Sequence, residues 1–373
     1  MRTLLMRPAV ALFAALCLWT TVAVPSHGQQ SSRLPAAFPA SAWAALAHGE
    51  RADAERLARA RPGVDVSAVA ILAHLAIDRG RFDEALAMLR PAAARAPQSD
   101  AALELGLLQQ QLGHAAAAET VLVPVSRQPG EDVAARLRAG LAAAALGQAP
   151  EANRLLRAAA AGGRDRRVDT AWGRLFLAKD NRAEAVKSFQ QAIGADPLWA
   201  AAHAGLGRAL ADEDPDAAGA AARRALEIDP HLADAELLLA EIDVDGSHYD
   251  EARARIARVL DWNPAELDAV ALSAAINYVR GNLAGFDADA ARALAVNPAF
   301  GEVYRAAAAL TARNYRFDEA VALARRATTV DPGSARAHAE LGMHLMRTGD
   351  EAAARTALDR AFKIDPYDTV TFN

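Results

Sequence analysis

Residues 166–199 read RRVDTAWGRLFLAKDNRAEAVKSFQQAIGADPLW, and the Asp-Pro pair near the end of this stretch recurs along the chain. Six Asp-Pro or Asn-Pro pairs follow one another at spacings of 33, 34, 34, 34 and 34 residues, and their prolines are Pro197, Pro230, Pro264, Pro298, Pro332 and Pro366. A fixed period of this length indicates a repeat architecture, in which each repeat is one small supersecondary unit.

Small residues also hold fixed places within each unit. An alanine precedes the proline by twelve residues, and a second alanine precedes it by five, except where Phe286 and Val259 replace them. Alanine is abundant in the whole chain, whereas aromatic residues make up only 5% of it. Because alanine is the best helix former and a poor strand former, the composition favours an all-α fold.

The unit at 166–199 resembles the tetratricopeptide repeat, a family of 34-residue units that each form two antiparallel helices. The residues that match the family pattern are Trp172, Gly173, Phe176, Ala185, Phe189, Ala192 and Pro197. Residues 335–368 match similarly, with Leu341, Gly342, Leu345, Ala354, Leu358, Ala361 and Pro366. Weaker units lie at 66–98, 99–132 and 133–165, after a degenerate unit at 35–65. The resemblance implies a right-handed α-solenoid of about nine to ten stacked antiparallel helical hairpins over residues 35–366.

The pattern has a physical basis. Small residues such as Gly173 and Gly342 let the two helices of a hairpin approach closely, while larger apolar residues fill the remaining space. The Phe-Asp-Glu-Ala turns are expected to place Asp83 and Asp318 where they accept hydrogen bonds from free amides at the start of the next helix. No hairpin buries its apolar face alone, so neighbouring hairpins are expected to share one continuous core.

Residues 1–28 have the features of a secretory signal peptide. Two arginines precede an apolar run of sixteen residues, and small residues at positions 26 and 28 suit cleavage after Gly28. A permanent anchor is the alternative, but a membrane span needs about 20 apolar residues. The only cysteine, Cys17, lies inside this run, and the preceding Leu16 disfavours lipid attachment. We therefore expect a periplasmic or secreted protein that starts at Gln29, contains no disulfide and has no stable membrane insertion.

The charge of the chain argues against polyanionic partners. The net charge is −5, and it becomes −7 without residues 1–28, which hold two arginines and no acidic residue. No run of five or six basic residues occurs. A mildly acidic protein has no general attraction to nucleic acid or to an anionic membrane surface, so neither is expected as a partner.

Three motifs look chemical but fit the repeat better. Residues 243–246 begin like a calcium loop, but the twelfth position lacks the required glutamate. Residues 205–207 suggest a dinucleotide-binding loop, but no strand precedes them and the third glycine is absent. His338 and His344 are six residues apart, whereas a zinc-protease helix needs His-Glu-x-x-His. No catalytic residue, metal site or cofactor is expected, and the chain is not expected to be an enzyme.

The first helix of each unit should line a concave groove. The resemblance places groove-facing residues at about the second, fifth, ninth and twelfth positions of each unit. These candidates for partner binding are Arg167, Thr170, Arg174, Arg208, Asp234, Glu241, Tyr278, Glu302, Arg305, Met343 and Met346. They predict a basic stripe in the middle units and a mixed, methionine-bearing surface in the late ones, although the same residues could simply be solvated.

Two functional hypotheses follow. The first is a non-catalytic adaptor in the bacterial cell envelope that binds a protein or a peptide segment in its groove. The second rests on the late units and the C-terminal residues, which resemble an exported repeat array that precedes a zinc metallopeptidase-like domain in some bacterial proteins. The chain would then be the substrate- or partner-binding arm of such a protein, without its catalytic domain.

The two ends of the array lead to further expectations. Residues 29–34 read as a short linker, and residues 367–373 read as a tail or the start of a further unit. The last hairpin carries Leu358 and Phe362 on its second helix, with too few residues after it for a covering helix. Because exposure of large apolar side chains is unfavourable, we expect a partner or self-association to cover this end.

Overall fold

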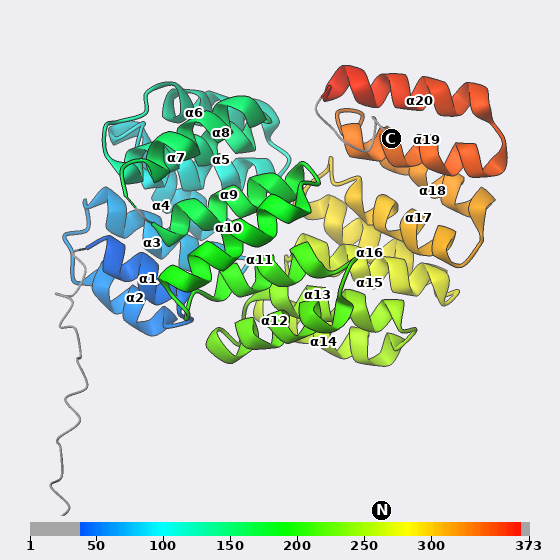
Figure 1. Ribbon diagram of the computed structural model, residues 1–373, viewed down its shortest axis with the longest axis horizontal. Coiled ribbons are helices and arrows are strands. Elements are labelled where there is room, and N and C mark those ends of the chain that lie inside the picture. The colour runs from blue at the N-terminus through cyan, green and yellow to red at the C-terminus, as the bar shows by residue number, and fades with distance from the viewer. Residues whose placement is uncertain (1–37, 164, 367–373) are drawn as a thin grey trace, which may run out of the picture. The chain divides into compact units, whose positions relative to one another are not determined.

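The computed structural model describes residues 38–163 and 165–366, and these residues form twenty helices and no strand (Figure 1). The helices pair as ten consecutive antiparallel hairpins, which we number as repeats 1 to 10. In chain order these are α1 (Ala40–Ala47) with α2 (Arg51–Arg59), α3 (Val66–Ile77) with α4 (Phe82–Arg95), α5 (Asp100–Gln111) with α6 (Ala115–Arg127), α7 (Val133–Ala145) with α8 (Ala149–Ala160), α9 (Arg166–Ala178) with α10 (Arg182–Ala195), α11 (Ala200–Leu210) with α12 (Pro215–Ile228), α13 (Ala233–Asp245) with α14 (Tyr249–Trp262), α15 (Leu267–Val279) with α16 (Leu283–Val296), α17 (Glu302–Arg313) with α18 (Phe317–Val330), and α19 (Ala335–Thr348) with α20 (Glu351–Ile364). The all-α solenoid expected from the sequence is confirmed.

Small residues join the two helices of a hairpin as expected. A Cβ atom added to Gly173 on α9 would lie 2.7 Å from the ring of Phe189, which is fully buried on α10. A Cβ atom at Gly342 on α19 would lie 2.7 Å from Leu358 on α20. The helices can therefore be this close only because these positions lack a side chain.

The core continues from one hairpin to the next. Its largest buried cluster runs from Leu237 on α13 to Ala357 on α20, so four successive repeats share one apolar interior. The alanines that recur within the units, such as Ala185 and Ala327, are completely buried. This sharing is the reason that a repeat array is stable although a single hairpin is not.

The expected capping role of Asp83 and Asp318 is wrong. Helices α4 and α18 begin after Arg81 and Arg316, which make no side-chain cap, so both aspartates lie in the first helical turn. There they interact favourably with the positive end of the helix dipole. Where Asn or Asp stands directly before the helix, as Asn181 does, its side chain accepts a hydrogen bond from a first-turn amide.

The turn inside each hairpin contains one residue with a left-handed backbone, with one exception. Glycine fills this place in six repeats, and Asp180, Ser247 and Tyr315 fill it in three. In repeat 6 no residue between α11 and α12 has a positive φ. The 33-residue spacing between Pro197 and Pro230 spans this turn, so the shorter unit is the one that omits the left-handed residue.

Turns that lie five repeats apart touch one another, and we call this line of contact the seam. Three left-handed glycines, Gly49, Gly80 and Gly113, lie against Asp229, Asn263 and Asn297 respectively. Each of these Asx residues directly precedes the proline that ends a repeat, and their relative exposures are only 3%, 4% and 9%. The seam therefore joins repeats 1, 2 and 3 to repeats 6, 7 and 8.

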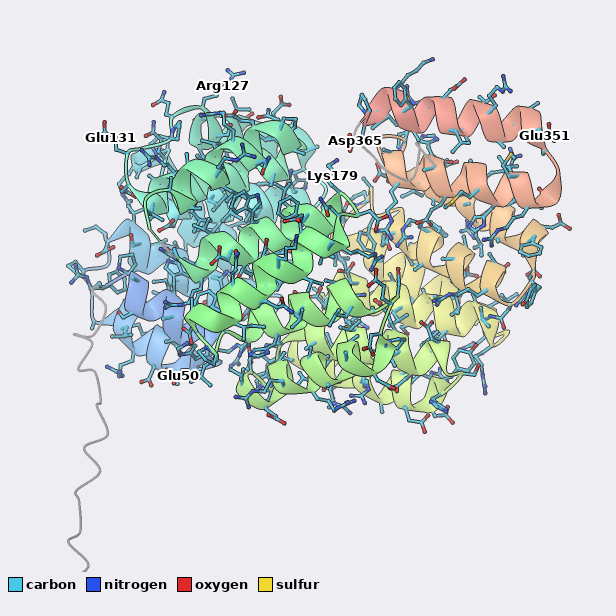
Figure 2. All side chains as sticks on the ribbon, in the orientation of Figure 1. Glu50, Arg127, Glu131, Lys179, Glu351 and Asp365 are labelled. Carbon is cyan, nitrogen blue, oxygen red and sulfur yellow. The ribbon has the colours of Figure 1, made fainter. Side chains whose placement is uncertain are left out.

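Ion pairs extend the seam. The guanidinium of Arg51 lies 2.5 Å from Asp229 and 3.4 Å from Asp78. Lys179 in repeat 5 donates to Asp365 at the end of repeat 10 over 2.6 Å, and Figure 2 shows their side chains near each other. The seam borders one side of the concave face, which contains partly open cavities.

Several expectations concern residues outside the described ranges. The signal peptide at 1–28, the linker at 29–34 and the segment 367–373 all lie there. No helix within residues 38–163 and 165–366 is both long and apolar enough to cross a membrane. At the C-terminal end, Leu358 is half-buried against Gly342 while Phe362 is 46% exposed. Self-association through this end remains a prediction.

Replacing Gly80 by alanine should destabilise the protein more than the same change at Gly147. Both glycines have a φ near +70° and would suffer similar backbone strain, about 1–2 kcal/mol. A Cβ at residue 80 would also meet Asn263 across the seam, whereas a Cβ at residue 147 meets nothing within 4 Å. The extra loss should be about 1–3 kcal/mol, measured by urea unfolding. Equal losses would show that the seam contributes nothing to stability.

Candidate functional site

The concave face encloses two adjacent cavities. The first cavity has a volume of about 790 Å³ and is lined by the odd-numbered helices α1 to α13 together with the end of α14. The second cavity has a volume of about 1150 Å³ and is lined mainly by α9, α11, α13, α15 and α17. Arg174, Ala201 and Asp234 line both cavities, so the two spaces meet beside these residues.

The first cavity is lined by three tryptophans, Trp43, Trp199 and Trp262, and packing fixes their rings. Trp43 on α1 makes an edge contact with His74 at a centroid distance of 5.4 Å. Trp262 stacks on His231, with ring centroids 3.6 Å apart, and the Arg79 guanidinium lies 4.1 Å from its centroid. Such rigid aromatic walls supply contact area at a low cost in conformational entropy.

The arginines of the first cavity have carboxylate partners. Arg138 on α7 lies 2.9 Å from Asp100 on α5, and Arg258 on α14 lies 2.8 Å from Glu236 on α13. The acid comes from a neighbouring helix in each case. These pairs orient the arginines and neutralise much of their charge.

His74 carries a positive charge at neutral pH. Its Nδ1 lies 3.1 Å from Glu104 and its Nε2 lies 3.8 Å from Asp78. Burial opposes the charged imidazolium, but Glu104 and Asp78 outweigh this effect and raise the pKa of His74 to about 9. His74 thus belongs to the ion pairs of the cavity wall.

Two carboxyl groups at the start of α15 have the opposite surroundings. Burial, together with Asp268, Asp234 and Asp78, raises the pKa of Glu266 to about 7. The side chain of Asp268 is exposed, but it lines the second cavity and is therefore surrounded by protein. Burial and the charges of Glu302, Asp234 and Glu241 raise its pKa to about 6, and Arg208 offsets only part of this. Negative charge is therefore in excess at this part of the wall.

The arginines of the second cavity are also paired. Arg208 donates to Glu241, one repeat further along the chain. Arg305 contacts both Glu302 and Glu340, and its side chain is only 13% exposed. The expected basic stripe is therefore wrong as a description of charge, because its arginines are paired with acids: Arg167 with Asp165, Arg174 with Asp234 and Arg208 with Glu241.

The cavity walls contain eight of the eleven residues that the repeat register predicts for the groove. Arg167, Thr170 and Arg174 line the first cavity, and the second is lined by Arg174, Arg208, Asp234, Glu241, Glu302 and Arg305. That these residues bind a partner remains a prediction.

The other three predicted residues line neither cavity. Tyr278 lies at the end of α15, where its hydroxyl donates to Glu319 over 3.1 Å and its ring packs against Phe286. Met343 and Met346 on α19 are 41% and 55% exposed. Tyr278 therefore faces the next hairpin and not the cavities, and partner binding by these three residues remains a prediction.

Glu266, Asp268 and the three tryptophans are not among the residues predicted for the groove. Asp268 stands 34 residues after Asp234 and 34 before Glu302. This shared repeat position is the sequence signal that could have identified Asp268 as a residue of the cavity wall. The tryptophans stand at unrelated repeat positions, and no sequence signal brings them together.

No metal-binding group is found in the described ranges, where no three histidine, cysteine or carboxylate side chains converge suitably. His344 is 6% exposed, and neither of its ring nitrogens has a hydrogen-bond partner. Burial lowers the pKa of His344, so its ring is packed in the neutral form. His338 is half-buried and lies 3.3 Å from the carbonyl oxygen of Pro332.

The free energy of unfolding should fall as the pH rises from about 5 to about 9. The pKa of Glu266 is raised from 4.5 to about 7, so folding opposes its ionisation across that interval. The pKa of His74 is raised from 6.5 to about 9, so its stabilising charge is lost above the lower value. Glu266→Gln should reduce the first decline, to which Asp268 also contributes, by roughly 1–2 kcal/mol after allowance for cavity water, and His74→Gln should remove the second. Urea unfolding at each pH measures both, and an unchanged pH profile in either variant would contradict the assignment.

Comparison with known proteins supports the assignment of the repeats. One tetratricopeptide-repeat model matches residues 209–276, and another model of the same family matches 72–122, 170–233 and 305–369. No curated protein sequence matches significantly.

Two solved structures illustrate the structural similarity. One is a crystal structure of the APC/C hetero-tetramer Cut9–Hcn1, with 14% identity and a TM-score of 0.43 over 87% of this chain. The alignment spans 58% of that longer chain. The other is a tetratricopeptide repeat protein from Parabacteroides merdae, with 16% identity and a TM-score of 0.43, covering 65% of this chain and all of the other. The family-model matches extend over more than half of the sequence, and on that basis the chain belongs to the tetratricopeptide-repeat family.

Proposed function

We propose that this protein is a non-catalytic scaffold of the bacterial cell envelope that binds a polypeptide partner within its two cavities. The observation that supports this most directly is the pair of adjacent cavities, which odd-numbered helices of successive repeats line together. Tetratricopeptide repeats generally bind proteins, and the family is generally non-catalytic. The location in the envelope rests on the signal-like features of residues 1–28.

An extended polypeptide segment is the occupant that suits the site. The cavities adjoin at Arg174, Ala201 and Asp234, so a chain can lie in both. The first cavity offers apolar wall from Leu103, Leu137 and its tryptophans, which suits side chains as anchors. The second cavity combines apolar residues such as Leu177 and Leu237 with ion-paired groups, and the latter suit backbone and polar side chains.

The second hypothesis from the sequence, a partner-binding arm of a metallopeptidase-like protein, uses the same cavities. No contact within the described residues favours it over a separate scaffold. It remains a prediction, and the two hypotheses agree on where a polypeptide would bind.

A bulky residue at the junction of the cavities should block binding. Ala201→Trp on α11 would fill space that both cavities share, whereas Ala220→Trp would add the same group to an exposed site on α12. Peptides selected from a random display library on the wild-type protein should bind Ala201→Trp at least roughly tenfold more weakly, a loss of about 1.4 kcal/mol. They should bind Ala220→Trp as they bind the wild type.

The result is interpretable only if both variants keep the helical circular dichroism of the wild type. The scaffold proposal would be overturned if no peptide were enriched on the wild type, or if Ala201→Trp bound the selected peptides with unchanged affinity.

The export proposal has a separate test. Expressed with its own N-terminus in a Gram-negative host, the protein should be recovered from the periplasm with an intact mass that starts at Gln29, because the features of residues 1–28 suit removal by signal peptidase. A mass that retains residues 1–28, or that includes a lipid on Cys17, would contradict it.

A further inference from the structure

We propose that the cavities select a basic polypeptide segment, whose lysine or arginine side chains bind the carboxylates of Asp268, Glu266 and Asp234. This inference rests on the proposed scaffold function and adds the chemistry of the partner. It is argued from the shape of the cavities, from the contacts of their charged groups and from the distribution of those contacts along the wall.

The first argument is that the wall has no cation left for an acidic partner. Arg208 is bound to Glu241, and Arg305 is held between Glu302 and Glu340. At the junction, Arg174 lies 3.5 Å from Asp234, and both side chains are more than half exposed. An anionic segment would have to displace these intramolecular partners, which costs the interactions that they already make.

The second argument is that carboxylates are left over. Asp268 has no hydrogen bond and no ion pair with any residue of the described ranges. Glu266 accepts one hydrogen bond, from the side-chain amide of Asn263 over 3.0 Å. Burial is the main cause of the raised pKa values of both Glu266 and Asp268, and nearby acids add to it, above all Asp268 for Glu266 and Glu302 for Asp268. A bound ammonium or guanidinium group would relieve the repulsion from these acids.

The third argument is the regular spacing of the acids. Asp234, Asp268 and Glu302 stand 34 residues apart and lie in the first turns of α13, α15 and α17 on the wall of the second cavity. Packed helices lie about 8–10 Å apart, and a segment in the polyproline-II conformation advances about 3.1 Å per residue with every third side chain on the same face. A segment that crosses these helices would therefore present every third side chain to successive carboxylates.

The neighbouring first cavity suits the remainder of such a segment. Arginine and lysine carry long apolar stems that pack on apolar surface while the charged end stays polar. The protein itself shows this mode of contact, since the Arg79 guanidinium lies 4.1 Å from the centroid of Trp262. Trp43, Leu103 and Leu137 provide further apolar wall beside the carboxylates.

The test uses three fluorescein-labelled peptides of about twelve residues, built from Gly-Ser-Arg, Gly-Ser-Gln or Gly-Ser-Glu repeats, so that every third side chain varies. Fluorescence anisotropy should show the tightest binding for the arginine peptide. Its affinity should decrease with added salt, and it should increase between about pH 5.5 and pH 8, as Asp268 and Glu266 ionise.

A charge-removal variant locates the effect. The double variant Glu266→Gln with Asp268→Asn should lose at least roughly tenfold in affinity for the arginine peptide. The control double variant Asp216→Asn with Glu227→Gln removes the same charge from exposed positions on α12 and should bind like the wild type. Because burial and neighbouring acids disfavour both native carboxylates, the cavity variant should remain folded, as thermal unfolding can verify.

The outcomes separate the two proposals. Equal or tighter binding of the glutamate or glutamine peptide, equal losses in the two double variants, or no saturable binding of the arginine peptide below about 100 µM would overturn the basic-segment inference. If display-selected acidic or neutral peptides bind and Ala201→Trp abolishes that binding, the scaffold proposal stands while this inference falls. If Ala201→Trp leaves all peptide binding unchanged, the scaffold proposal falls as well.

Discussion

The contact between a left-handed turn glycine and a buried Asx side chain five repeats away determines the rest of this structure. In the seam the oxygen of Asn263 accepts a hydrogen bond from the amide of Ala265, which fixes the turn that Gly80 approaches. Asn297 does the same with Ala299, beside Gly113. Because only a hydrogen atom fits between the two turns, the array closes at a fixed distance and its concave face becomes two cavities of defined size.

The sequence was sufficient to predict the helices but not the seam. The period, the recurrent alanines and the Asx-Pro pairs predict about nine to ten hairpins and their order, because all of these depend on local packing. The glycines at 80, 113 and 147 look alike in the sequence, yet only the first two meet a partner across the seam. That difference depends on the small rotation from each repeat to the next, which no single repeat encodes.

The candidate site was only partly predictable, because some of its features are local to one hairpin and others depend on how distant repeats meet. The repeat register places Arg174, Arg208 and Glu302 correctly on a cavity wall, since the register is a property of each hairpin. The register does not show whether another residue neutralises their charges, because the partner of Arg208 is an acid of the following repeat. The gathering of Trp43, Trp199 and Trp262 depends on repeats 1, 5 and 7 meeting around one space, which follows from the closure of the seam.

The turn of repeat 6 lacks the left-handed residue, and this bears on which insertions and deletions the protein can accept in evolution. Every other hairpin keeps the residue, and its absence is accepted here, where the turn contributes no glycine to the seam. Gain or loss of an entire repeat would bring another Asx-Pro turn to each seam glycine, with equivalent chemistry. A single-residue deletion in the turn of repeat 2 would instead remove the contact made by Gly80. Selection on this chain should therefore tolerate changes in length by whole repeats more readily than by single residues at the seam.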